Sequence, residues 1–134
     1  MDFKSYVFDR FGIEIDERII ERKNDVILLS KSTSVYDNAE KYGIIAGRKE
    51  TKYYKPTTDF IQLYGGLATR NVVFLSIDEF KSLLVEKSKK IDDFPLSRGY
   101  VILSTYDFPL GCGFFDGTSV KPMIPKSKLV GFIL

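Results

Sequence analysis

The sequence contains no histidine, and this absence excludes several kinds of catalytic and metal site. A Ser-His-Asp triad, a Cys-His dyad and a zinc or iron site built on imidazole all need that side chain. The one cysteine, Cys112, allows neither a disulfide within the chain nor a metal cluster made of cysteines alone. Long apolar runs are also missing, since no stretch reaches the ~18 residues of a membrane-spanning helix. We therefore expect no membrane partner.

The first residues, Met1 to Tyr6, lack the basic stretch followed by an apolar stretch that marks a signal peptide. Because a disulfide framework is also missing, we expect a cytoplasmic protein. The chain has 134 residues, of which 44% are hydrophobic and 28% are charged. This size and composition predict one globular domain over residues 1–134.

The N-terminal region, residues 1–25, predicts a helix followed by the start of a hairpin. Asp2 can cap the helix, and Gly12 can end it. Strands are expected over residues 18–22 and 25–30, because both stretches are rich in β-branched residues and only Lys-Asn separates them.

The middle of the chain predicts short elements. In order, we expect a helix over residues 37–42, a strand over 44–47, a polar loop over 48–57, a helix capped by Thr57 or Thr58 and broken by Gly65-Gly66, and a strand over 71–75. Ser76 and Glu79 form a capping box, in which each side chain can bond the free backbone N–H of the other residue. The helix that follows has its apolar residues at helical spacing.

A polar, exposed connection is expected over residues 87–98, and residues 99–134 then predict a run of strands. These are residues 100–104, residues 110–115, a third strand after the hairpin turn Asp116-Gly117, and an apolar final strand over residues 130–134. The order of elements fits a small α+β domain with a partly closed sheet. It does not fit a doubly wound parallel sheet, which needs regular alternation of strands and helices.

Positive charge is concentrated in two segments, although the net charge is only +2. Residues 48–70 carry five basic and two acidic side chains, and residues 117–134 carry three lysines and no acid. If the fold brings the two segments together, they form one positive patch, which favours a bound polyanion. Chance segregation of charge on a solvated surface is the alternative explanation.

The first positive segment also contains aromatic residues. Cations hold phosphates, and exposed tyrosines stack on unpaired bases at ~1–3 kcal/mol each. The alternative is a loop whose tyrosines pack back onto the domain. The candidate RNA-contacting residues are Arg48, Lys49, Lys52, Tyr53, Tyr54, Lys55, Arg70, Asn71, Lys121, Lys126 and Lys128.

Evidence for an enzyme is weaker. Cys112 lies between two glycines, with no histidine in the chain and no lysine close in sequence to lower the pKa of its thiol, so a structural cysteine is favoured. The glycine-rich strings that bind ATP or NAD are absent, and we expect no cofactor. A small enzyme that uses Asp59, Asp107 or Cys112 is an alternative, and it needs a pocket with perturbed titrating groups.

Six strings along the chain together resemble a known family. They are Ala46-Gly47-Arg48, Lys55-Pro-Thr-Thr-Asp-Phe60, Ala68-Thr-Arg-Asn-Val72, Gly99-Tyr-Val-Ile-Leu103, Pro109-Leu-Gly-Cys-Gly113 and Ile124-Pro-Lys126. In this order, from about residue 26 to 130, the chain resembles small archaeal proteins related to the C-terminal RNA-binding, PUA-like domain of the Fmu/Sun family of RNA cytosine-5 methyltransferases.

The resemblance implies a PUA-like fold, a compact β-pseudobarrel of mixed strands with short helices, that binds structured tRNA or rRNA during RNA modification or ribosome biogenesis. The methyltransferase part of that family is missing here, and Cys112 follows Gly111 rather than a proline, so methyl transfer is not implied. We therefore expect a non-catalytic RNA-binding module with no DNA partner. The alternative is a protein-interaction subunit that docks on a separate RNA methyltransferase or ribosome-assembly factor.

Overall fold

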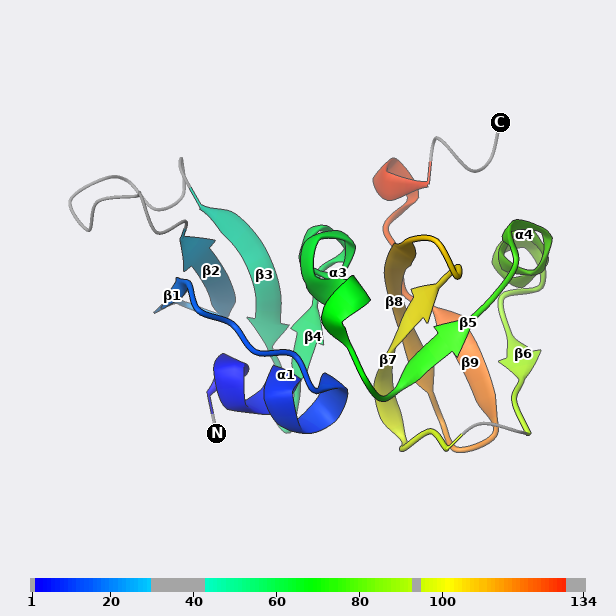
Figure 1. Cartoon of the computed structure of the whole chain (residues 1–134), viewed down its shortest axis with the longest axis horizontal. Coiled ribbons are helices and arrows are strands. Elements are labelled where there is room, and N and C mark those ends of the chain that lie inside the picture. The colour runs from blue at the N-terminus through cyan, green and yellow to red at the C-terminus, as the bar shows by residue number, and fades with distance from the viewer. Residues whose placement is uncertain (1, 30–42, 93–94, 130–134) are drawn as a thin grey trace.

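The structure is a computed structural model that describes residues 2–29, 43–92 and 95–129. Two β-sheets are combined with helices α1 (Phe3–Phe11), α3 (Thr58–Tyr64) and α4 (Ile77–Glu86). Figure 1 shows α3 between the two sheets and α4 at the far side of the second sheet. This arrangement confirms a mixed α+β fold. Among the described residues, no helix is long and apolar enough to cross a membrane.

The first sheet is antiparallel, with strand order β1-β2-β3-β4. Its strands are β1 (Arg18–Arg22), β2 (Asp25–Leu29), β3 (Ile44–Lys49) and β4 (Tyr54–Pro56). The predicted hairpin is confirmed as β1 and β2. The predicted polar loop over residues 48–57 is wrong, because β3 continues to Lys49 and β4 pairs with it. A three-residue edge strand that ends in proline is too short to show the alternation of apolar and polar residues that predicts a strand.

The second sheet is mixed, with strand order β5-β7-β8-β9-β6. Its strands are β5 (Val72–Phe74), β6 (Lys89–Lys90), β7 (Gly99–Ser104), β8 (Pro109–Phe115) and β9 (Ser119–Pro122). β5 pairs in parallel with β7, while the other pairs are antiparallel. The predicted strands in this region and the turn between β8 and β9 are confirmed. The exposed connection predicted over residues 87–98 is wrong at β6 and at Ile91, which is buried.

Strand β7 is buried along its whole length and lies between two apolar clusters. Tyr100 and Ile102 pack with residues of α1, β2, β3, β4 and α3, whereas Val101 and Leu103 pack with residues of α4, β5, β8 and β9. Successive side chains of a strand point to opposite faces. One strand therefore contributes alternate residues to both clusters.

The predicted helix ends are confirmed. The Asp2 side chain accepts a hydrogen bond from the Ser5 N–H at 2.8 Å, and Gly12 ends α1 with a φ of 76°, in the left-handed region. An added Cβ at Gly12 would collide with Thr69 Oγ1, and the left-handed backbone disfavours other residues as well, so glycine suits this position. Ser76 and Glu79 form the expected capping box of α4. Such a cap is worth ~1 kcal/mol.

Two short 3₁₀ turns complete the structure, η1 (Gly65–Leu67) and η2 (Lys126–Lys128). The predicted break after α3 is confirmed, since η1 begins at Gly65. The helix expected over residues 37–42 and the strand expected over residues 130–134 lie outside the described residues.

Candidate nucleic-acid interface

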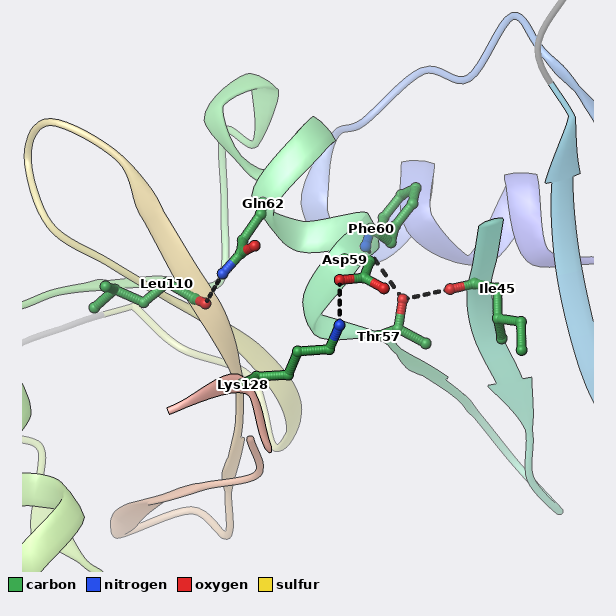
Figure 2. A network of polar contacts seen from close by, with 7 residues as sticks. All are labelled: Ile45, Thr57, Asp59, Phe60, Gln62, Leu110 and Lys128. Carbon is green, nitrogen blue, oxygen red and sulfur yellow. Dashed lines mark hydrogen bonds and ion pairs between the residues drawn. The ribbon is translucent and has the colours of Figure 1, made fainter. Parts of the chain in front are cut away.

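The beginning of α3 is attached to the first sheet, and its middle is attached to the second. Thr57 Oγ1 accepts a hydrogen bond from the Phe60 N–H at 3.1 Å and donates one to the Ile45 carbonyl of β3 at 2.6 Å (Figure 2). Gln62 Nε2 donates to the Leu110 carbonyl of β8 at 3.2 Å. Helix α3 therefore holds β3 and β8 in a fixed relation.

The segment after β9 returns to the same place. The Met123 N–H donates to the Cys112 carbonyl of β8 at 2.8 Å. Gly111 lies so close to Ile124 that an added Cβ would approach its Cδ1 to 2.7 Å. This approach lets η2 reach the beginning of α3, where Lys128 Nζ lies 2.9 Å from Asp59 Oδ1 (Figure 2).

A pocket of about 290 Å³ lies among these elements. Arg48 and Lys55 line it from the β3–β4 hairpin, and Lys128 lines it from η2. Asp59 contributes a carboxylate, so the lining keeps an excess of positive charge. The other lining residues are Ile45, Pro56, Thr57, Thr58, Met123 and Pro125. The two positive segments of the sequence thus meet at one pocket.

Arg48 and Lys55 lie directly opposite each other on β3 and β4. Like charges in opposite positions of an antiparallel pair destabilise that pair. Asp25 lies opposite Arg48 on β2 and offsets part of this repulsion. An anion bound in the pocket would offset more of it, so this hairpin suits a ligand that carries phosphate.

Several predicted contact residues do not line the pocket. Lys49 follows Arg48 along β3 and so belongs to the opposite face of that strand. Lys52 and Tyr53 are exposed between β3 and β4, Lys121 is exposed on β9, and Lys126 is exposed on η2. These residues can widen a positive surface around the pocket, but the structure does not gather them into it.

Tyr54 is a core residue. Its side chain is 5% exposed, its ring packs edge-on against Phe3 at 5.5 Å between centroids, and its hydroxyl donates to Glu21 Oε1 at 2.7 Å. Burial, with the hydrogen bond to Glu21, raises the pKa of Tyr54 to about 12. This placement corrects the expectation that Tyr54 stacks on a base. Tyr53, its 40% exposed neighbour, keeps that possibility.

Asn71 is also part of the scaffold. Its side chain donates to the Arg10 carbonyl at 2.7 Å and accepts from the Ser97 N–H at 2.9 Å, and the residue is only 8% exposed. This corrects the expectation that Asn71 contacts RNA. Arg70 is exposed, but its guanidinium donates to the Asp9 carbonyl at 2.9 Å and to the Phe8 carbonyl, at the end of α1.

Cys112 is buried in β8, as expected for a structural cysteine. Burial raises the pKa of its thiol to about 12, so it is protonated at neutral pH and poorly nucleophilic. Neither Cys112 nor Asp107 lines the pocket. In the described part of the chain, no group of three or more Cys, Asp or Glu side chains is placed to hold a metal ion.

An exposed aromatic cluster, which the sequence pattern did not predict, lies beside β5. The Phe74 ring on β5 stacks on the Tyr106 ring with centroids 5.1 Å apart and planes 6° apart, and Tyr106 is 85% exposed. Phe108 is exposed as well, and the turn between β7 and β8 is held by bonds from the Asp107 and Phe108 N–H groups to Thr105 Oγ1. The presence of two aromatic residues, Tyr106 and Phe108, in one short turn is the sequence feature that could have indicated this cluster.

No protein-family model matches this chain, and no curated protein matches it.

Proposed function

We propose that this chain is a cytoplasmic, non-catalytic RNA-binding module that acts on tRNA or rRNA during RNA modification or ribosome biogenesis. One observation carries the proposal: Arg48, Lys55 and Lys128, from two distant positive segments, line a single pocket. Cations gathered at one site are what phosphate binding needs. Exposed Lys52, Tyr53 and Lys126 extend the proposed contact surface.

The resemblance to PUA-like domains supports the same partner. In this proposal, the strands around β7 and β8 correspond to the β-pseudobarrel of that fold, and structured RNA is favoured over DNA. The catalytic domain of the related methyltransferases has no counterpart among these residues. In this proposal the module positions RNA for chemistry that takes place outside these residues.

Filter-binding titrations with tRNA and rRNA fragments, repeated over a range of KCl concentrations, test the proposal. The affinity falls as salt rises, and each phosphate contact that is lost makes the plot of log affinity against log salt less steep, by ~0.9 on duplex and ~0.7 on single strands. We expect Arg48→Ala, Lys55→Ala and Lys128→Ala each to reduce the steepness by the amount of about one phosphate contact. Lys81→Ala, at an exposed position of α4, is the matched control. The absence of binding at low salt would contradict the proposal.

The aromatic cluster favours a second candidate, a protein-interaction subunit that docks on an RNA methyltransferase or ribosome-assembly factor. Stacked rings on a hydrogen-bonded turn form a preorganised apolar contact surface of the kind that interfaces bury. If this candidate is correct, co-purification with such a factor survives nuclease treatment. Tyr106→Ser would then abolish co-purification, whereas Arg48→Ala would leave it intact.

A further inference from the structure

The pocket combines two kinds of wall. Ile45, Met123 and Pro125 are apolar, whereas Arg48 and Lys55 are cationic. Its volume of about 290 Å³ lies at the small end of ligand pockets, so it holds one small group and excludes a double helix. A bare phosphate needs no apolar wall. A group with a flat apolar part and an attached phosphate satisfies both kinds of wall.

Thr58 gives an independent observation at the same place. It lines the pocket, it is 4% exposed, and its Oγ1 has no hydrogen-bond partner among the described residues. A buried hydroxyl without a partner is unfavourable. The Oγ1 atom has almost no accessible surface, so the edge of a nucleobase, which carries both N–H donors and oxygen or nitrogen acceptors, can bond it only after the Thr58 side chain rotates toward the pocket.

The ion pair between Asp59 and Lys128 leaves the pocket accessible. Both side chains are about half exposed, and an exposed ion pair contributes little stability. Lys128 can therefore exchange the Asp59 carboxylate for a phosphate at a small cost in free energy. A bound phosphate would also offset the repulsion between Arg48 and Lys55.

We propose that this pocket holds one unpaired nucleotide of the bound RNA, with its phosphate on Arg48 and Lys55 and its base against Ile45, Met123, Pro125 and Thr58. This inference rests on the proposed RNA-binding function and adds a ligand class to it. RNA would be read at a bulge, a loop or an end, where a base is free to leave the stack.

Three RNA duplexes of the same sequence test the inference by fluorescence anisotropy. One is fully paired, one carries a single bulged nucleotide (each of the four bases in turn), and one carries a bulged abasic ribose. We expect the bulged nucleotide to raise affinity about tenfold over both other duplexes, as the contribution of one buried base. Equal affinity for all three would overturn the nucleotide pocket and leave RNA binding intact. No binding to any duplex at low salt would overturn both.

Two variants keep the test independent of folding. Thr58→Val removes the unpartnered hydroxyl, so it should raise the unfolding temperature yet reduce the advantage of the bulged duplex several-fold. Ile45→Ala should reduce that advantage, while Val85→Ala, at an exposed apolar position of α4, should not. If both pocket variants keep the full advantage, the base lies elsewhere and the inference is wrong.

A competition experiment identifies the source of the nucleotide. We expect 5′-mononucleotides to bind more weakly than the bulged duplex, because they lack the phosphate contacts outside the pocket. Tighter binding of a mononucleotide would assign the pocket to a free nucleotide and overturn its assignment to RNA.

Discussion

Arg10 and Arg48 carry the same guanidinium group, but the fold places them in different surroundings. Arg10 donates to three backbone carbonyls near the start of β7, to Tyr100 at 2.7 Å, Arg98 at 3.2 Å and Ser97 at 2.6 Å. Arg48 is exposed on β3, opposite Lys55, at the edge of a pocket. The first arginine fastens α1 to the second sheet, whereas the second lines the pocket that we propose binds RNA.

The difference shows that a positive charge in the sequence does not by itself indicate a binding residue. Arg70 lies in the same positive segment as Arg48, and the neutral Asn71 follows that segment, yet both side chains bond carbonyls at the end of α1. The surroundings of each side chain decide whether it contacts backbone carbonyls of the fold or faces a pocket. The end of a helix leaves carbonyls without partners, and nearby donors satisfy them.

The largest effect is expected at Arg10. Arg10→Ala removes charge-assisted bonds to three carbonyls and should lower the free energy of unfolding by about 3 kcal/mol, measured by urea denaturation. Arg10→Lys should recover only a minor part of the lost free energy of unfolding, because an ammonium group cannot reproduce the planar arrangement of donors of a guanidinium. RNA affinity of the folded variant should be unchanged. A stability loss no larger than that of Arg48→Ala would erase the distinction between the two arginines.

Asn71 should give the next largest effect. Its φ of 56° lies in the left-handed region, and its side chain joins the Arg10 carbonyl to the Ser97 N–H. Asn71→Ala should cost about 2–3 kcal/mol, from lost hydrogen bonds and a strained backbone. Asn71→Gly relieves the strain but not the lost bonds, so it should be ~1 kcal/mol less destabilising in the same denaturation assay. Equal losses would assign the whole effect to the side chain.

Much of the scaffold was predictable from local signals. The caps at Asp2, Thr57 and Ser76 and the turn after β8 act within a few residues, so the sequence displays them directly. Strands β4 and β6 were not predicted, because they are short and contain too few apolar residues to alternate with their polar ones.

The site was predictable only in part. Charge segregation indicated the two positive segments, but their meeting depends on Gly111 and Ile124, which no local pattern connects. Tyr53 and Tyr54 are adjacent in sequence, and pairing of β4 with β3 decides which of them is buried. Asn71 resembled a polar contact residue because its partners lie far away in the chain.

Lys55 offers a test in which two properties change in opposite directions. Lys55→Glu places an acid opposite Arg48, so it should stabilise the hairpin by about 0.5 kcal/mol. The same change should weaken RNA binding, because it replaces a cation of the pocket with an anion. Denaturation and anisotropy on one preparation measure both. A substitution that lowered both stability and affinity would indicate a structural contribution of Lys55, like that of Arg10.

The smallest effect concerns Glu79. Hydrogen bonds with Ser76, supported by Lys89 at 3.4 Å, lower the pKa of its carboxyl group. A lowered pKa in the folded state adds stability at pH values above the usual carboxyl pKa, and this stability is lost as the pH falls through the lowered value. Glu79→Gln should therefore flatten the acid side of the stability profile slightly, measured by thermal unfolding from neutral to acidic pH. A profile identical to that of the parent would mean that the cap is insensitive to charge.

Strand β7 has a consequence for how the molecule opens. Because its alternate side chains belong to two apolar clusters, we expect a loss of packing in one cluster to disturb the other. Local openings that release β1 or β6 leave this strand covered, and only a global transition exposes it. The amides of β7 should therefore exchange with solvent deuterium most slowly, at one common rate set by global unfolding. The protein is thus expected to behave as one cooperative unit even though it contains two sheets.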